Sequence, residues 1–419
     1  MMTQAFYTGI SGLRTNQTAI DAISDNLANV SSIGFRGYTT EFSSLFESTL
    51  NTSANSTSVN SSVGVGVKMN STQLNETNGT LILSDKSTDL AIDGDGWFGI
   101  QGDGKPLYTR DGTFTFDANR DLVTYDGFHV LGTMGGNISG ETLTSPISET
   151  KLGNVSAQEK LNFPYTLTFP TTPTTNVSFY ANLGVTDEIR KISAGVIDAQ
   201  SNKNNLNLEF TKSTVQNPPG IQWDIVATTK SLDGETVYDT QAATAAFDSS
   251  GALISTTLGS INNNGTSIKL DLGIGYNGIT SFNGPSPLGS SKADGLQGGD
   301  LLGYDINTNG EVIATFSNGQ QSSVGKIALF HFQNDKGLER INGSRFEESA
   351  NSGQPLFFKN ADGENILGAT LQNFKLESSN VKFEVGLTEL IVFQRSYGAN
   401  SKCITTADEM MQKALNMHK

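Results

Sequence analysis

Residues 383–411 have the sequence FEVGLTELIVFQRSYGANSKCITTADEMM. In this stretch a large apolar side chain recurs at every seventh position, at Phe383, Leu390, Tyr397, Ile404 and Met411. The start of the chain has a matching row at the same spacing, made of Phe6, Leu13, Ile20 and Leu27. A seven-residue repeat keeps one stripe of a helix facing a partner helix and favours a left-handed supercoil. The two ends are therefore expected to pair as a coiled-coil-like root.

Two segments are predicted to form these helices. Residues 3–30 place Ile20, Ile23 and Leu27 on one helical face, and glycines at 34 and 37 end the segment. Residues 376–417 form the second helix, which at about 1.5 Å per residue would be roughly 60 Å long. A helix of that length needs a partner along most of its length. Cys403, the only cysteine, is expected to be a small packed thiol.

The middle of the chain is predicted to be β-structure. It contains all fifteen Asn-Gly and Asp-Gly dipeptides, which lie between residues 78 and 363. These dipeptides are the strongest short hairpin signal because both turn positions tolerate positive φ. Two expected hairpins are 122–125 with 128–131, and 312–316 with 324–332. The predicted fold class is α+β and multidomain, with mainly antiparallel β-domains between the paired terminal helices.

Composition shifts predict the domain boundaries. A Pro-rich and Thr-rich stretch begins near residue 153, and Gly-Pro and Gly-Gly pairs occur within 285–300. Residues 41–72 are rich in Ser, Thr and Asn and predict either a disordered linker or a segment that orders only when neighbouring copies pack around it. The expected parts are terminal helices at 1–40 and 375–419, a connector at 41–72, a discontinuous β-domain at 73–152 and 300–374, and an inserted outer β-domain at 153–299.

Charge and motifs exclude several functional classes. The formal net charge is -15, and both ends are neutral, so the acidic charge lies in the middle. No basic patch offers nucleic acid a site, no stretch is apolar enough to span a membrane, and no secretory signal core is expected at the start. The G-x-G-x-x-G match at 94–99 is expected to be turns between strands, and the calcium-like start at 117–121 lacks the later ligands. We expect no enzyme activity, cofactor, metal or catalytic residue.

Several motifs resemble those of the flagellar rod, hook and basal-body axial protein family. They are SDNLAN at 24–29, GFR at 34–36, TDLAIDG at 88–94, YTRDG at 108–112, LESSNV at 376–381 and QRSYGAN at 394–400. Asp25 and Leu27 depart from the usual Asn and Ile, and Arg120 stands where the family often has a turn with glycine. The extra residues at 153–299 and the stretch 316–338 resemble the hook members in particular.

The resemblance implies a self-assembling structural subunit of a curved helical tube, a joint that passes motor torque to the filament. Implied partners are the chain itself, the distal rod, hook cap and hook–filament junction proteins, and the type III export apparatus, which exports without a cleaved signal to the extracellular hook. Alternatives are a hook-like or distal-rod paralogue, or a secreted β-rich adhesin. The implied self-assembly residues are the two seven-residue rows together with Asn26, Asn29, Gln394, Arg395 and Asn400. Gln394 and Arg395 are either a solvated helical face or hydrogen-bonding groups between subunits.

Overall fold

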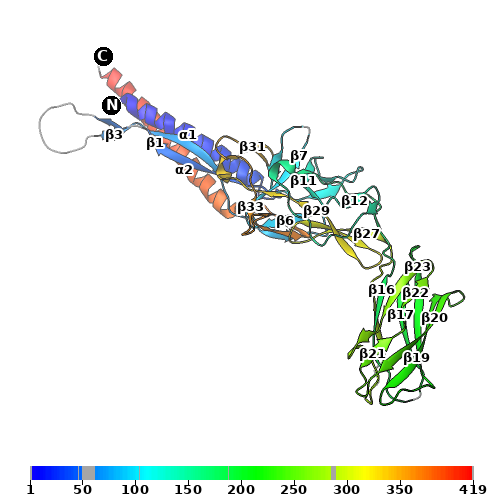
Figure 1. Cartoon of the computed structure of the whole chain (residues 1–419). Helices are drawn as coiled ribbons and strands as arrows, with labels where there is room; N and C mark the ends of the chain where they lie inside the picture. Colours follow the sequence, from blue (N-terminus) through cyan, green and yellow to red (C-terminus); the bar gives the residue numbers. More distant parts are fainter. Residues whose placement is uncertain are drawn as a thin grey trace.

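The computed structural model describes residues 2–45, 47–49, 62–102, 104–186, 188–284 and 289–417. The molecule is elongated (Figure 1), with two long helices at one end, a β-rich body in the middle and a second β-rich unit at the far end. The N- and C-terminal ends lie together at the tip of the helical end. The chain therefore begins and ends at the helical end of the molecule.

Helix α1 comprises Met2–Ala28 and helix α2 comprises Phe383–Asn416. They run side by side in opposite directions, because Leu27 contacts the start of α2 at Gly386 whereas Gly9 contacts Ile404. The expected helix over 376–417 is corrected at its start, because strand β36 (Lys375–Glu377) pairs with β5 (Leu81–Leu83) instead. Pairing of the backbone with β5 outweighs the helical pattern there.

A two-stranded ribbon lies beside α1. Strand β1 (Tyr38–Ser44) pairs antiparallel with β4 (Val67–Leu74), and β2 (Glu47–Thr49) pairs with β3 (Ser62–Gly64). The Thr15 hydroxyl of α1 donates to the Val67 carbonyl at 3.3 Å. The described parts of the predicted connector at 41–72 are thus mostly strand rather than linker, because α1 gives the ribbon a surface to pack on. Residue 46 and residues 50–61 of that prediction lie outside the described residues.

The body is a mainly antiparallel β-structure around one hydrophobic core. The two expected hairpins are confirmed: Val123 pairs with His129, and Val312 pairs with Gly325. The remaining body elements are β6 (Leu90–Asp93), β7 (Trp97–Gln101), β8 (Leu107–Thr109), β9 (Phe114–Phe116), β10 (Leu122–Thr124), β11 (His129–Met134), β12 (Ile138–Ser139), β13 (Thr142–Leu143), η1 (Val155–Ala157), β14 (Glu159–Lys160), β15 (Thr168–Phe169), β27 (Gly299–Ile306), β28 (Glu311–Phe316), β29 (Gln321–Ile327), β30 (Leu329–Phe330), η2 (Asp335–Gly337), β31 (Glu339–Asn342), β32 (Arg345–Glu347), β33 (Phe358–Lys359), β34 (Asn365–Ile366) and β35 (Thr370–Asn373).

The unit at the far end has its own core, in which Trp223 is fully buried. A five-stranded antiparallel sheet, β17 to β21, packs with a six-stranded sheet that contains parallel pairs of β16 with β23 and β25. Its strands are β16 (Asn176–Asn182), β17 (Arg190–Ile197), β18 (Lys203–Lys212), β19 (Ile221–Ser231), β20 (Val237–Phe247), β21 (Leu253–Thr256), β22 (Ser260–Asn263), β23 (Thr266–Asp271), β24 (Gly273–Ile274), β25 (Asn277–Thr280) and β26 (Ser290–Ala293).

The boundary predicted near residue 153 differs from the observed packing. Phe163 and Phe169 are buried in the body core, whereas the second core begins at Val177. The prolines near 164–173 therefore lie in the segment that connects the body to the outer unit, and they do not mark the start of an independent unit. The segment that returns from the outer unit lies beside the segment that enters it, because the Asp294 carboxylate accepts the Thr175 N–H at 2.8 Å.

Candidate self-assembly surface

Small residues of α1 face α2. Gly9, Gly12, Thr15, Ala19 and Ile23 are buried, whereas the predicted row Phe6, Leu13, Ile20 and Leu27 is only half-buried. A Cβ on Gly12 would lie 2.7 Å from the Asn400 side chain, and one on Gly9 would lie 2.7 Å from Ile404. Small side chains allow the two backbones to come close together. Gly9 and Gly12 were the sequence signal for this close approach, and Leu27 and Ile404 of the predicted rows also take part in the contact.

Only part of the predicted row of α2 turns toward α1. Leu390, Ile404 and Met411 are half-buried, and Ala407 is buried. Phe383 and Tyr397 are more exposed, by 54% and 38%. Phe393, which the prediction omitted, is half-buried, and its ring centroid lies 5.7 Å from that of Phe42 in β1. The face toward α1 is therefore shifted relative to the strict seven-residue row.

Two flanks of α2 carry exposed apolar side chains. Phe383 and Leu387 are four residues apart and share one flank. Val385 and Val392 are seven apart and share another, and each is more than half exposed. At about 100° per residue, these flanks lie on opposite sides of the α1 contact. The isolated chain leaves both flanks in water, which is unusual for a helix of a finished globular fold.

The remaining side of α2 is charged. Glu384, Arg395, Lys402, Glu409 and Lys413 are all exposed and fall on one stripe at helical spacing. Gln394 and Arg395 are exposed and make no intrachain side-chain hydrogen bond or ion pair with the part of the chain that the structure describes. Helix α2 thus has four distinct sides: one against α1, two apolar flanks and one charged stripe.

Asn26 and Asn29 have partners within the chain. The Asn26 amide donates to the Tyr38 carbonyl at 2.7 Å, and the Tyr38 N–H donates back to the Asn26 oxygen at 2.9 Å. Asn29 donates to the Asp25 carbonyl at 2.9 Å and accepts from Ser32. These two side chains hold the turn that leads from α1 into β1. Asn380, which the prediction omitted, does the same for α2 by accepting the Gly37 N–H at 2.9 Å.

A buried ion cluster joins the helical end to the body. Glu377 lies between Arg36, at 2.9 Å, and Arg110, at 3.2 Å, and none of the three side chains is more than 3% exposed. Burial lowers the pKa of Arg36 to about 10, and burial also lowers the pKa of Arg110. Arg36 therefore remains cationic near neutral pH. Arg36 also donates to the carbonyls of Glu76 and Thr77, so the cluster fixes the chain segments on which both helices begin or end.

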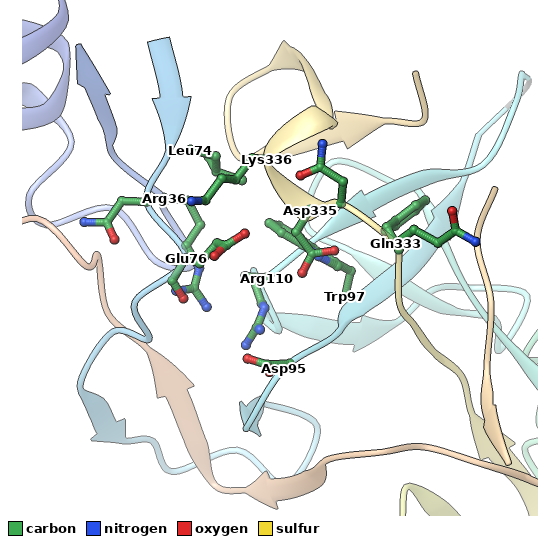
Figure 2. A pocket seen from close by; sticks show the side chains of 12 residues that line it. Arg36, Leu74, Glu76, Asp95, Trp97, Arg110, Gln333, Asp335 and Lys336 are labelled. Carbon is green, nitrogen blue, oxygen red and sulfur yellow. The ribbon is translucent and has the colours of Figure 1, made fainter. Parts of the chain in front are cut away.

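Figure 2 shows a polar cleft beside this cluster, with a volume of about 410 Å³. Arg36 and Arg110 reach it from one side, and Asp335 from η2 and Trp97 from β7 lie together on the other. Burial raises the pKa of Asp335. Charges of both signs line the cleft, which lies between η2 and the segments that connect the two helices to the body.

The two sequence motifs that resemble dinucleotide and calcium sites form turns. In the G-x-G-x-x-G match, Gly94 and Gly96 have φ of 125° and 128° between β6 and β7. At 117–121 the Asp117 carboxylate accepts the N–H groups of Asn119 and Asp121 at 2.8 Å. No helix among the described residues is long and apolar enough to cross a membrane.

Three regions of the chain match known families of flagellar proteins. Residues 6–36 match the family described as flagella basal body rod protein, 91–157 match the flagellar hook protein FlgE/F/G D1 domain, and 372–417 match the flagellar basal body rod FlgEFG protein C-terminal region. The chain is 30% identical over 424 residues to the flagellar hook protein FlgE of Brucella suis, covering 98% of each. It is 28% identical over 439 residues to FlgE of Salmonella typhimurium, covering 99% of this chain and all of that protein.

Among solved structures, the flagellar hook protein FlgE2 of Helicobacter pylori matches with a TM-score of 0.54 and 16% identity, over 71% of this chain and 100% of that chain. That likeness supports the fold. The paired termini and the family matches at both ends define a flagellar axial protein. The full-length matches are more specific, and the chain belongs to the flagellar hook protein FlgE family. Its function is that of a structural hook subunit and not of an enzyme.

Proposed function

We propose that copies of this chain polymerise into a curved helical tube in which α1 and α2, paired as a coiled coil, form the inner wall. The observation that carries this proposal is the four-sided character of α2. One side is covered by α1, and two flanks expose Leu387 and Val392 to water. A ring of copies would cover both flanks of every subunit at once, which a closed dimer would not do.

The charged stripe of α2 suits the lumen of such a tube. Arg395, Lys402 and Lys413 stay solvated there, since the stripe lies on the opposite side of the helix from α1. Gln394 and Arg395 then border the apolar flank, where they could also hydrogen-bond to the next copy. Asn400 and Asn26 act indirectly, by setting the distance between α1 and α2 and the exit of the chain into β1.

The β-rich parts would project outward and supply the flexibility of the joint. The acidic charge of the chain lies in these parts, and the two hydrophobic cores are separate. Polar, hydrated contacts between outer units slide more readily than interlocked apolar helices. A tube with a tightly packed helical wall and wet outer contacts would resist twisting and still bend, and so would pass motor torque to the filament.

We extend the proposal to the partners implied by the motifs. The ends of the tube would continue into other axial proteins, namely the distal rod, the hook cap and the hook–filament junction. Related proteins use the same terminal helices, as the family matches at 6–36 and 372–417 support. The subunit would reach the extracellular hook through the type III export apparatus without a cleaved signal.

The test is an aspartate on each apolar flank. Leu387→Asp and Val392→Asp should abolish polymerisation, because a carboxylate buried between copies without a partner costs several kcal/mol in every subunit. The readouts are sedimentation, negative-stain electron microscopy and circular dichroism of the soluble chain. Lys402→Asp, on the charged stripe, is the matched control and should still give tubes. Wild-type polymerisation by both flank variants would exclude α2 from the wall.

A further inference from the structure

A groove with a volume of about 480 Å³ lies between α1 and the ribbon formed by β1 and β4. Tyr7, Ile10 and Arg14 line it from α1, and Lys68 lines it from β4. At about 100° per residue, Ile10 and Arg14 lie on the opposite side of α1 from Gly12, which contacts α2. A partner can therefore enter the groove without displacing α2.

The walls of the groove are held together within the free chain. The Ser11 hydroxyl accepts the Val67 N–H at 3.3 Å, and the Thr15 hydroxyl donates to the Val67 carbonyl at 3.3 Å. Gly66 has a φ of 124°, and a Cβ there would lie 2.2 Å from the Ser11 Oγ. Glycine at this position lets the ribbon pack closely on α1. The groove is thus formed before any partner binds, which lowers the entropic cost of binding.

The groove combines apolar side chains with two unpaired cations. Tyr7 is 69% exposed and Ile10 is 39% exposed. Arg14 and Lys68 are exposed, and neither side chain forms an ion pair or hydrogen bond with the described residues. The neighbouring stretch 48–67 contains no charged residue, so it has no acid to offer them. A complementary occupant must supply an acidic group together with apolar side chains.

One flank of α2 has this combination. Val385 is 52% exposed and Val392 is 54% exposed. Glu389 lies four residues after the first and three before the second, so the three side chains share one face of the helix. Glu389 is exposed and has no ion pair or side-chain hydrogen bond with the part of the chain that the structure describes. The flank therefore presents one free carboxylate between two valines.

Glu389 cannot pair with Arg14 of its own chain. Gly12 contacts Asn400, so Arg14 lies beside a part of α2 that is roughly 14 Å along the axis from Glu389, at 1.5 Å per residue. Arg14 also projects from the side of α1 that faces away from α2. An acid–base contact between these two residues requires a second copy.

We propose that the groove of one copy binds the Val385–Val392 flank of a second copy, with Glu389 placed between Arg14 and Lys68. This inference rests on the proposed polymerisation and names the surface that covers one flank of α2. The groove and the flank are different surfaces, so every copy offers both. Such a heterologous contact repeats from copy to copy and builds a ring or a helical tube rather than a closed dimer.

The sizes of the side chains agree with this pairing. In a tube whose copies all point the same way, α1 of one copy runs antiparallel to α2 of the next. In the register that the ion pair sets, Ile10 lies opposite Val392, and Tyr7 lies opposite Ser396. The large exposed ring of Tyr7 thus meets a small side chain, and the two aliphatic side chains meet each other.

Charge reversal in the full chain tests the pairing. Arg14→Glu and Glu389→Arg each bring like charges together in the groove, and each should raise the critical concentration for tube formation about tenfold, measured by sedimentation. The free chain should unfold at the wild-type temperature in both cases, because both side chains are exposed and unpaired in it. The double variant restores opposite charges between copies and should polymerise at a lower concentration than either single variant.

The matched control is Lys402→Glu, which reverses an exposed cation on the charged stripe of α2 and should polymerise like the wild type. Unchanged critical concentrations for both single variants would overturn the pairing of groove and flank while leaving the proposed tube intact. A double variant that polymerises no better than the single variants would also overturn it. Failure of the wild type to form tubes at any concentration would instead contradict the proposed function.

Discussion

At the scale of single residues, the geometry where the helices join the body depends on a few polar side chains and on close contacts. Gly34 shows this, because its φ is 64° and a Cβ there would lie 2.3 Å from the Asp111 nitrogen. Its N–H donates to the Glu377 carbonyl at 2.7 Å. The G-F-R motif therefore brings Arg36 to Glu377 through a turn that only glycine fits.

Replacing the shared carboxylate should be costly. Glu377→Gln leaves Arg36 and Arg110 buried without a counter-charge, and breaking a buried ion pair costs about 3–5 kcal/mol. Thermal and denaturant unfolding of the free chain should show this loss of stability. Lys151→Ala, which removes the exposed ion pair with Glu364, is the control and should leave the unfolding transition unchanged. Equal stability of Glu377→Gln and wild type would mean that the cluster is not what joins the helices to the body.

A larger side chain at the helix crossing should also be harmful. Gly12→Val places atoms where Asn400 lies 2.7 Å from a Cβ, and such overpacking costs about 1–3 kcal/mol. We expect faster proteolysis of α1 and α2 with an unchanged unfolding transition of the body. If protease cleaves the variant and the wild type at the same rate, the close approach at Gly12 does not hold the helices together.

At the scale of elements, α2 depends on α1 in the free chain and on neighbouring copies in the tube. Ile404→Asp should separate α2 from α1, because Ile404 packs on Gly9 and a carboxylate there has no partner. Lower helical circular dichroism and loss of sedimentable polymer would show this, with the β-signal retained. Lys413→Asp, exposed near the end of the same helix, is the control. Normal assembly of Ile404→Asp would show that pairing of α1 with α2 is not needed for the tube.

At the scale of the whole molecule, the separate cores imply that the outer unit can be removed. Thr175 and Asp294 are hydrogen-bonded where the chain leaves and returns, so a short linker can join them after deletion of 176–293. The body should unfold as before, and the shortened chain should still form tubes, with altered curvature visible by electron microscopy. Unfolding of the body after this deletion would show that the two cores depend on each other.

The outer unit should also respond to acid through Asp198. Burial disfavours the ionised carboxyl, but hydrogen bonds from Asn264, Asn202 and backbone N–H groups outweigh it and hold the pKa of Asp198 below its ordinary value of 3.8. The folded state therefore binds a proton less readily than the unfolded chain. The stabilisation is present above pH 3.8 and is lost as the pH falls through the lower folded value.

Thermal unfolding followed by the fluorescence of buried Trp223 measures this effect. Asp198→Asn should lower the unfolding temperature at pH 7 and weaken its fall toward pH 2, because one titrating group is removed. Asp224→Asn, exposed on β19 of the same unit, is the control and should behave like the wild type near pH 7. An identical pH profile for Asp198→Asn and wild type would rule out Asp198 as the acid-sensitive group.

Local pattern by itself determined the helical ends, the β-rich middle, the hairpins at Asn-Gly and Asp-Gly turns and the family motifs. These follow from periodicity and turn chemistry, which act over a few residues. Arg120, at the position where the family often has a turn with glycine, has a φ of 66°, which only the structure showed. The predicted roles of the seven-residue rows and of Gln394, Arg395 and Tyr397 in assembly stay predictions.

Only the tertiary structure decided which side of each helix is covered. The buried stripe of α1 is made of small residues such as Gly9 and Gly12, because the closeness of two backbones depends on both partners at once and not on either pattern. The start of α2 at Phe383 was decided in the same way, by pairing of residues 375–377 with a strand almost 300 positions earlier in the chain. The Arg36–Glu377–Arg110 cluster likewise joins three distant motifs, and no local rule relates residues that meet only after the chain has folded.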